Sequence, residues 1–431
     1  MGATLRRRSG IFLRKQGYGD YKRWISAEKA LDFLIIAMAK KAMALVDELT
    51  PDVLMDILSR LPAKSLLRCK SVSKYWYSLI LNPNFISLHR TRAQPYYYIH
   101  LIPSGTAESS MYMVPDETSI EQLDLSFTGP HLKEFCHGGS SRGLMCLFNF
   151  KNSDIVLCNP AMRESRLLPR PPSATLRTTY LGFAFIPQTN DYNVVRLATI
   201  YESDLKKPFE SYDDDEAFRM HIRSTHTSVE HKVQIYSMST DSWKEIGGMV
   251  PNYYLYPRSR TCMSLDGVFY WSSYSSNDYS ANVCVINALN MVGELYERIS
   301  LPAGICDEYP DLCLLDDSLA LVASKDDCDL EDTCFDVWLM DKYGVDERWT
   351  KRYTIGRIGP LLGCDFVIGF RPNNEILLAG GNDWEFLSYN LSTHDMKEYK
   401  QLCNWSESFY LQQVFSYSES LVSVKRQVDL T

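Results

Sequence analysis

Two stretches of the chain gather side chains of the types that bind metal ions. His221, His226 and His231 recur at every fifth residue, whereas two ligands on one face of a helix need a spacing of three or four. The acidic run from Asp326 to Asp332 has the charge of a calcium-binding loop but lacks its central glycine and its closing glutamate. The sequence therefore predicts solvated loops at both places, with no metal and no other cofactor.

Nucleophiles and phosphate-binding groups also form no recognisable arrangement. The 12 cysteines are scattered without a Cys-x-x-Cys pair, which argues against both a zinc site and a disulfide framework. The sequence holds no nucleophile signature, phosphate-binding loop or metalloprotease helix. These patterns favour a protein that binds others over an enzyme with a reaction of its own.

A short apolar segment has the pattern of a helical module. Thr50 stands at an N-cap position, Pro51 takes the first helical position, and Asp52 follows in the first turn, where a negative charge suits the helix dipole. Apolar residues then recur at helical spacing until Pro62 stops the run. We therefore expect a helix to begin at this point.

Two further short helices are expected after the first. The second begins near Ala63, and the third runs from about Ser73 until the Asn82-Pro83 pair ends it. Three short helices cannot bury all the apolar side chains of this segment, so part of its surface should contact another protein. The alternative is that these side chains form only the module's own core.

The segment from Leu49 to Phe85 resembles an F-box. F-box modules dock on a Skp-type adaptor, which joins them to the cullin and RING subunits of a ubiquitin ligase, and the resemblance implies the same partners here. The first proline, Pro51, stands one residue later than in many F-boxes, so we expect altered entry geometry with binding retained. The positions that the resemblance assigns to adaptor binding are Leu49, Pro51, Leu54, Ile57, Leu58, Leu61, Pro62, Leu66, Leu67, Val72, Ser73, Trp76 and Leu79.

Charge divides the chain into a basic head and an acidic body. Residues 1–42 hold ten basic and three acidic side chains, a net charge of +7, which leaves −15 for the other 389 residues of a chain whose formal total is −8. Met43 stands just before the F-box-like segment, so we expect residues 1–42 to be a disordered extension or an incorrectly assigned start. The domains predicted are this extension, the F-box over 43–90 and a large domain over 95–426.

The acidic body also bears on the class of partner. Phosphate-binding surfaces need clustered Lys and Arg, so nucleic acid is not an expected partner. The longest apolar run near the N-terminus, residues 30–39, is about half the length that crosses a bilayer. We expect no membrane partner, and a cytoplasmic protein that could also enter the nucleus.

The chain from Pro95 onward has short β-prone runs separated by polar turns. A unit of two strands around a turn recurs, and its central residues are Leu157, Ile235, Ile286, Trp338 and Ser388, separated by 78, 51, 52 and 50 positions. A period near ~50 is typical of kelch-like propeller blades, whose stacking covers the apolar face that each unit leaves open. The predicted fold class is mainly β: an irregular kelch-like β-propeller after a three-helix N-terminal module. A pair of irregular β-sandwiches is the alternative.

Seven blocks of this domain are similar to the F-box-associated (FBA) domain of plants, particularly that of S-locus F-box proteins. The blocks begin at Ser140, Val156, Tyr180, Val233, Met263, Phe335 and Glu419. The resemblance implies a substrate receptor. In the S-locus subset the targets are pistil ribonucleases (S-RNases) of the self-incompatibility response, and a target outside reproduction is the alternative.

An acidic insertion accounts for the long first interval between the repeated units. It lies near Glu202 to His231, and its first half contains seven acidic side chains and two basic ones, Lys206 and Lys207. Such a loop would attract a basic protein. The target-binding residues predicted here are Glu202, Asp204, Glu210, Asp213, Asp214, Asp215 and Glu216. A solvated loop without a binding role is the alternative.

Together the two resemblances imply a non-catalytic substrate-recognition subunit of an SCF-type (Skp–cullin–F-box) ubiquitin ligase. One alternative is a propeller enzyme or sugar-binding protein with an unrelated helical cap. Another is an adaptor-binding scaffold that delivers no target.

Overall fold

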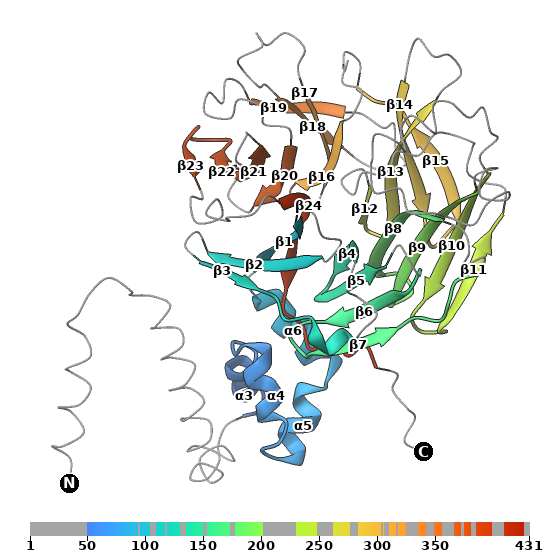
Figure 1. The fold of residues 1–431 in the computed structure, drawn as a ribbon. Helices are drawn as coiled ribbons and strands as arrows, with labels where there is room; N and C mark the ends of the chain where they lie inside the picture. The colour runs from blue at the N-terminus through green and yellow to red at the C-terminus, as the bar shows by residue number, and fades with distance from the viewer. Residues whose placement is uncertain are drawn as a thin grey trace. The chain divides into compact units, whose positions relative to one another are not determined.

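The computed structural model describes most of the chain from Thr50 onward (Figure 1). The described residues are 50–93, 95–103, 109–116, 119–129, 135–149, 153–172, 177–200, 230–247, 262–275, 283–302, 305, 310–315, 318–324, 335–341, 349–355, 366–371, 375–380, 385–398 and 409–425. The chain divides into two compact units, residues 1–93 and residues 94–431.

The described part of the first unit contains one helix more than expected. Its helices are α3 (Pro51–Leu58), α4 (Ala63–Cys69), α5 (Lys74–Ile80) and α6 (Pro83–Arg92). The third expected helix does end before Asn82, but the same Asn82-Pro83 pair starts α6. The Asn82 side chain accepts a hydrogen bond from the Asn84 backbone N–H (2.8 Å), and Pro83 takes the first helical position. The expectation of three helices missed α6 because a proline that ends one helix also suits the start of the next.

Polar side chains fasten α6 to the end of α3. His89 Nε2 lies 3.0 Å from the Leu61 carbonyl oxygen, and Arg92 Nη1 donates to the Asp56 carbonyl oxygen at 3.0 Å. The Arg92 guanidinium also lies 2.7 Å from the Asp56 carboxylate. Hydrogen bonds from Arg60 and then Arg92 lower the pKa of Asp56. These contacts hold two helices that are far apart in the module's sequence in one fixed arrangement.

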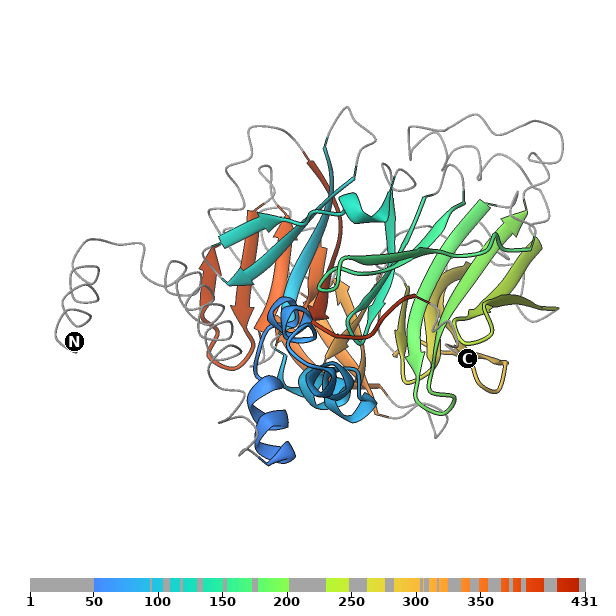
Figure 2. The same cartoon turned by 90° about the horizontal axis from the view of Figure 1, so that it is seen from below.

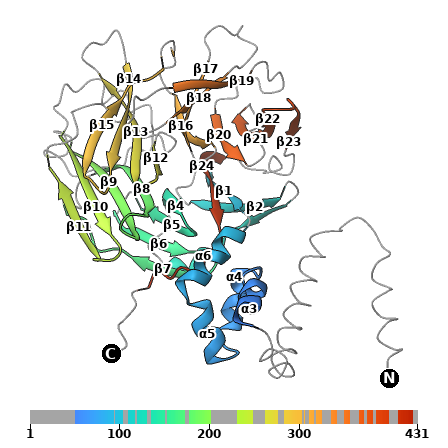
Figure 3. The same cartoon turned by 180° about the vertical axis from the view of Figure 1, so that it is seen from behind.

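The second unit is a β-propeller of six four-stranded antiparallel sheets, its blades (Figures 1 and 3). Five blades use consecutive strands: β4 (Cys136–Ser141), β5 (Leu144–Phe148), β6 (Ile155–Asn159), β7 (Glu164–Leu167); β8 (Arg177–Ile186), β9 (Asp191–Ile200), β10 (Glu230–Ser237), β11 (Ser242–Ile246); β12 (Cys262–Leu265), β13 (Val268–Ser275), β14 (Val283–Asn290), β15 (Leu295–Ile299); β16 (Asp311–Leu315), β17 (Ser318–Ser324), β18 (Phe335–Met340), β19 (Trp349–Ile355); and β20 (Phe366–Arg371), β21 (Glu375–Gly380), β22 (Glu385–Asn390), β23 (Met396–Glu398).

The sixth blade joins the two ends of the domain. Its strands, in order, are β24 (Phe409–Ser418), β1 (Pro95–Pro103), β2 (Ser110–Asp116) and β3 (Ser119–Gln122). β24 pairs antiparallel with β1 along the full length of both strands. The inner strands β4, β8, β12, β16, β20 and β24 each contact the next, and β24 contacts β4. The C-terminal strand therefore closes the ring (Figures 1 and 3). In Figure 2 this strand is dark red and lies beside the blue strand β1.

Hydrophobic clusters fill the spaces between neighbouring blades. Leu157 of β6 and Val194 of β9 share one cluster, while Val195 of β9 and Phe269 of β13 share the next. Gly182 of β8 allows the close approach there, because a Cβ atom at this position would collide with the Phe269 ring. Each blade thus buries its apolar face only against its neighbours, as in other repeat architectures.

The predicted repeat is confirmed as the outer half of five blades. Its central residues lie on β6, β10, β14, β18 and β22, the third strand of each blade. The long first interval contains residues 201–229, which connect β9 to β10. The closed ring excludes the alternative of two β-sandwiches.

Strand order sorts the connections onto two rims. The turns between the first and second strands of a blade, and between its third and fourth strands, form one rim, here called the short-turn rim. Examples are the turns 142–143, 266–267 and 160–163. The connections between second and third strands and between successive blades join strand ends at the opposite, long-loop rim. The longest of these are 201–229 and 247–261.

The segment after β24 fastens the closing strand to the next blade. Asn159, buried at the end of β6, donates to the carbonyl oxygens of Ser420 (2.9 Å) and Val422 (2.7 Å). Glu164 of β7 accepts a hydrogen bond from the Ser423 hydroxyl at 2.6 Å. The tail thereby adds polar contacts to the strand pairing that closes the ring.

Replacing Asn159 by alanine should lower the free energy of unfolding by about 2–4 kcal/mol, because two carbonyl oxygens lose their donor in a buried site. Urea denaturation measures this loss. Thr189→Ala, in the exposed turn between β8 and β9, is the control and should change stability by less than about 0.5 kcal/mol. Equal effects of the two changes would contradict the assigned role of Asn159.

A buried histidine makes stability depend on pH. His100 of β1 is 1% exposed and stacks on Phe135 with 5.0 Å between ring centroids. Burial lowers the pKa of His100 from 6.5 to about 3, against the opposing effect of a backbone hydrogen bond with Phe135. At pH values between these two pKa values, His100 therefore binds a proton in the unfolded chain but not in the folded chain.

Stability should accordingly fall as the pH drops below 6.5, and the His100 contribution from pH 7 to pH 5 amounts to about 2 kcal/mol. The variant His100→Phe removes this titration and should flatten the pH dependence of the unfolding free energy by that amount. Urea denaturation at both pH values compares the two proteins, and equal slopes would show that His100 is not the titrating group.

Candidate interaction surfaces

The first unit exposes several large apolar side chains on α3 and α5. Val53 (46% exposed) and Ile57 (47%) lie four residues apart on α3, a spacing that places them on one face. Tyr75 (49%) and Tyr77 (52%) project from α5, and Leu81 follows it. Exposed large hydrophobic residues in a small unit are candidates for contact with another protein. We call these five residues the exposed apolar set.

The structure separates the predicted adaptor-binding positions into surface and core. Leu54, Leu58 and Leu66 are at most 3% exposed. Pro51 and Ile57 are exposed, and Leu49 lies outside the described residues. Ser73 caps α5, because its hydroxyl oxygen accepts a hydrogen bond from the Trp76 backbone N–H (3.1 Å). The half-buried positions are Leu61, Pro62, Leu67, Val72, Trp76 and Leu79. The three buried leucines form the interior of the unit, so they support the neighbouring surface and do not themselves reach a docked protein.

The matched positions missed four members of the exposed apolar set, namely Val53, Tyr75, Tyr77 and Leu81. A signal was present in the sequence, because Val53 and Leu54 are adjacent apolar residues and so cannot share one helix face. What the sequence lacked was a way to tell which of the two faces the other helices cover.

The predicted target-binding residues, 202–216, all lie outside the described residues, within the connection 201–229 that leaves the long-loop rim. His221, His226 and the acidic run 326–332 also lie outside them. His231 is on β10, where its Nδ1 is 3.1 Å from Thr199 Oγ1 of the paired strand β9. Within the described part of the chain, no group of three or more His, Cys, Asp or Glu could hold a metal ion.

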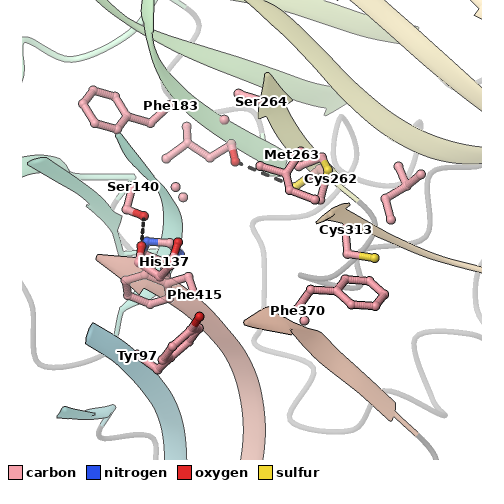
Figure 4. A pocket seen from close by; sticks show the side chains of 18 of the residues that line it. Tyr97, His137, Ser140, Phe183, Cys262, Met263, Ser264, Cys313, Phe370 and Phe415 are labelled. Carbon is pink, nitrogen blue, oxygen red and sulfur yellow. Dashed lines mark hydrogen bonds between the residues drawn. The ribbon is translucent and has the colours of Figure 1, made fainter. Parts of the chain in front are cut away.

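A cavity of about 210 Å³ lies on the propeller axis, surrounded by all six inner strands (Figure 4). Aromatic rings occupy one side of it, and His137 stacks on Phe415 with 3.5 Å between ring centroids. Sulfur-bearing side chains, Cys262, Met263 and Cys313, occupy the other side together with the ring of Phe370. Residues from strands at both ends of the domain thus meet in one chamber.

The cysteines of this cavity are not poised for chemistry. Burial raises the pKa of Cys262 to about 12 and raises that of Cys313 well above its usual range. Both thiols are therefore protonated at neutral pH, and a protonated thiol is a poor nucleophile and a poor metal ligand. The cavity offers apolar contact and polarisable sulfur instead of a reactive group.

None of the helices in the described ranges has the length and apolar character needed to span a bilayer.

The geometry defines a two-part protein, a small helical unit with an exposed apolar set and a six-bladed propeller. In comparison with known families, residues 46–88 match the F-box domain and residues 108–424 match the F-box associated beta propeller domain. The chain therefore belongs to the F-box proteins that carry an F-box-associated propeller. The sequence resemblance to these two families is confirmed.

Similar curated proteins include F-box proteins of a plant. "F-box protein CPR1" of Arabidopsis thaliana is 27% identical over 328 residues, which cover 70% of this chain and 72% of that protein. A second F-box protein of the same plant is 22% identical over 368 residues, which cover 81% of this chain and 85% of that protein. The likeness thus extends over both parts of the chain.

Proposed function

We propose that the protein is a substrate-recognition subunit of an SCF-type ubiquitin ligase. The F-box match over residues 46–88 supports it, because F-box modules bind Skp-type adaptors and through them the cullin and RING subunits. In this role the chain does no chemistry of its own. It raises the local concentration of a target protein beside the conjugating enzyme.

The adaptor is held, in this proposal, by the exposed apolar set. Burial of an exposed apolar side chain against a partner contributes roughly 25 cal/mol per Å² of apolar area, and tyrosine is enriched among the residues that dominate interface energetics. Leu54, Leu58 and Leu66 contribute indirectly, because their packing fixes the helices that carry the set.

The target is held, in this proposal, at the long-loop rim. β1 begins at Pro95, which pairs with Ser418 at the short-turn rim, so the long connections leave from the rim opposite the entry of the chain. Those connections include the acidic segment 202–216. Loops on a rigid scaffold commonly carry binding specificity. A basic protein is the proposed class of target, with an S-RNase as one instance and a non-reproductive protein as the other.

The double variant Ile57→Asp/Tyr77→Asp should abolish co-purification with a Skp-type adaptor, because an unpaired charge in a desolvated interface costs about 2–5 kcal/mol. Both side chains are about half exposed, so the fold should survive, which circular dichroism checks. Leu58 is unsuitable for this test, since a charge at a site only 2% exposed would unfold the unit.

The matched control is Leu295→Asp, which places the same charge on a leucine that is 57% exposed on the outer strand β15. This control should bind the adaptor as the wild type does. Undiminished binding by a folded Ile57→Asp/Tyr77→Asp variant would rule out the exposed apolar set as the docking surface.

For the target, changing Asp213, Asp214 and Asp215 to Asn should slow association at low salt and leave adaptor binding unchanged. The reason is that a concentrated negative field speeds the capture of a basic protein and is screened by salt. Stopped-flow or surface-based association rates across ionic strength, with a basic ribonuclease and an acidic protein of similar size, measure the effect. If neither rate nor salt dependence changes, the acidic segment is a spacer and the target site lies elsewhere.

A further inference from the structure

The walls of the axial cavity are uncharged. None of the described residues that line it carries a carboxylate, an ammonium or a guanidinium group. Transferring an ionised group into such a site without a partner is strongly unfavourable. The described lining of the cavity therefore favours a neutral occupant.

The shape and lining of the cavity favour a flat, aromatic occupant. His137 and Phe415 stack face to face with an interplanar angle of 6°, and Tyr97 and Phe183 extend the same aromatic wall (Figure 4). Sulfur atoms contact aromatic ring edges favourably, and the facing wall combines the sulfur atoms of Cys262, Met263 and Cys313 with the ring of Phe370. An apolar cavity of about 150 Å³ accepts benzene, so about 210 Å³ suits a ring system larger than one benzene ring.

The chamber wall recedes at one position. At Gly369, a β-bulge residue with φ +155°, an added Cβ would meet no atom within 4 Å. The Ser264 hydroxyl oxygen, in contrast, is fully buried, so it is not presented to an occupant of the cavity.

We propose that the axial cavity of the propeller is a binding site for a small, neutral, planar molecule of about two fused rings. The ring system lies between the wall of His137, Phe415, Tyr97 and Phe183 and the facing wall of Cys262, Met263, Cys313 and Phe370. The site is separate from the exposed apolar set and from the acidic segment, and it makes the propeller a small-molecule receptor as well as a scaffold for loops.

The test uses the full-length chain and two probes of matched shape, neutral 2-naphthol and anionic 2-naphthoate, with binding followed by probe fluorescence. 2-Naphthol should bind saturably with one site per chain, and 2-naphthoate should bind at least about 100-fold more weakly because its charge has no partner.

A filling variant locates the site. Leu314 lines the cavity and is 38% exposed, so Leu314→Trp should occupy the chamber without strain and weaken 2-naphthol at least about tenfold. Leu295→Trp, the same substitution on the outer strand β15, should leave binding unchanged. Thermal unfolding confirms that each variant is folded.

The proposal is overturned if 2-naphthol shows no saturable binding, if the two probes bind equally, or if folded Leu314→Trp binds as Leu295→Trp does. Adaptor co-purification, run on the same samples, reports separately on the proposed ligase role and should be unaffected by every variant.

Discussion

The pairing of β24 with β1 is the contact on which the rest of the propeller depends. It joins residues 409–418 to residues 95–103, so the whole domain lies within the loop that it closes. Loop-closure entropy grows only slowly with length, by about 0.6 kcal/mol for each doubling, and a long ladder of backbone hydrogen bonds together with the Asn159 contacts to the tail offsets it. Without this pairing β1 would be an unprotected edge strand, and the axial cavity would lack Phe415.

The same contact explains what the sequence could predict and what it could not. Five blades were found from their third and fourth strands, because a buried strand, a polar turn and a half-exposed strand are a local pattern that repeats. The sixth blade was not found from the sequence. Its inner strand β24 lies more than 300 residues from its paired strand β1, and no local pattern connects the two strands. The module shows the same limit, since α6 begins at a pair that sequence reasoning assigned to a helix end, and its contacts with Asp56 and Leu61 are tertiary.

The adaptor-binding positions inferred from the helical pattern remain a prediction. They combine the interior leucines Leu54, Leu58 and Leu66 with exposed or half-buried residues such as Ile57 and Trp76. A helix face that binds another protein is apolar, as is the face that packs in the interior. The periodicity of apolar residues in the sequence therefore predicts two apolar faces and does not tell which one is buried. Only the packing of the other helices shows that Val53 and Ile57 are on the uncovered face. The cavity was also beyond the sequence, because His137 and Phe415 become neighbours only when the ring is closed.

In the propeller, the packing between blades and the connections at the rims have different roles. The free energy that holds the ring together is concentrated between blades, where clusters such as that of Leu157 and Val194 exclude water. The clusters are built mainly from strand residues, and Leu168 and Leu301 join them from connections between successive blades. Changes of length and charge elsewhere in the connections are therefore compatible with the same packing of the strands. The cavity is different, because its walls are the inner strands themselves, and Gly182 shows how little room those strands leave for substitution. A recognition surface on the loops can therefore diversify freely, whereas a binding site on the axis is fixed by the same packing that makes the fold.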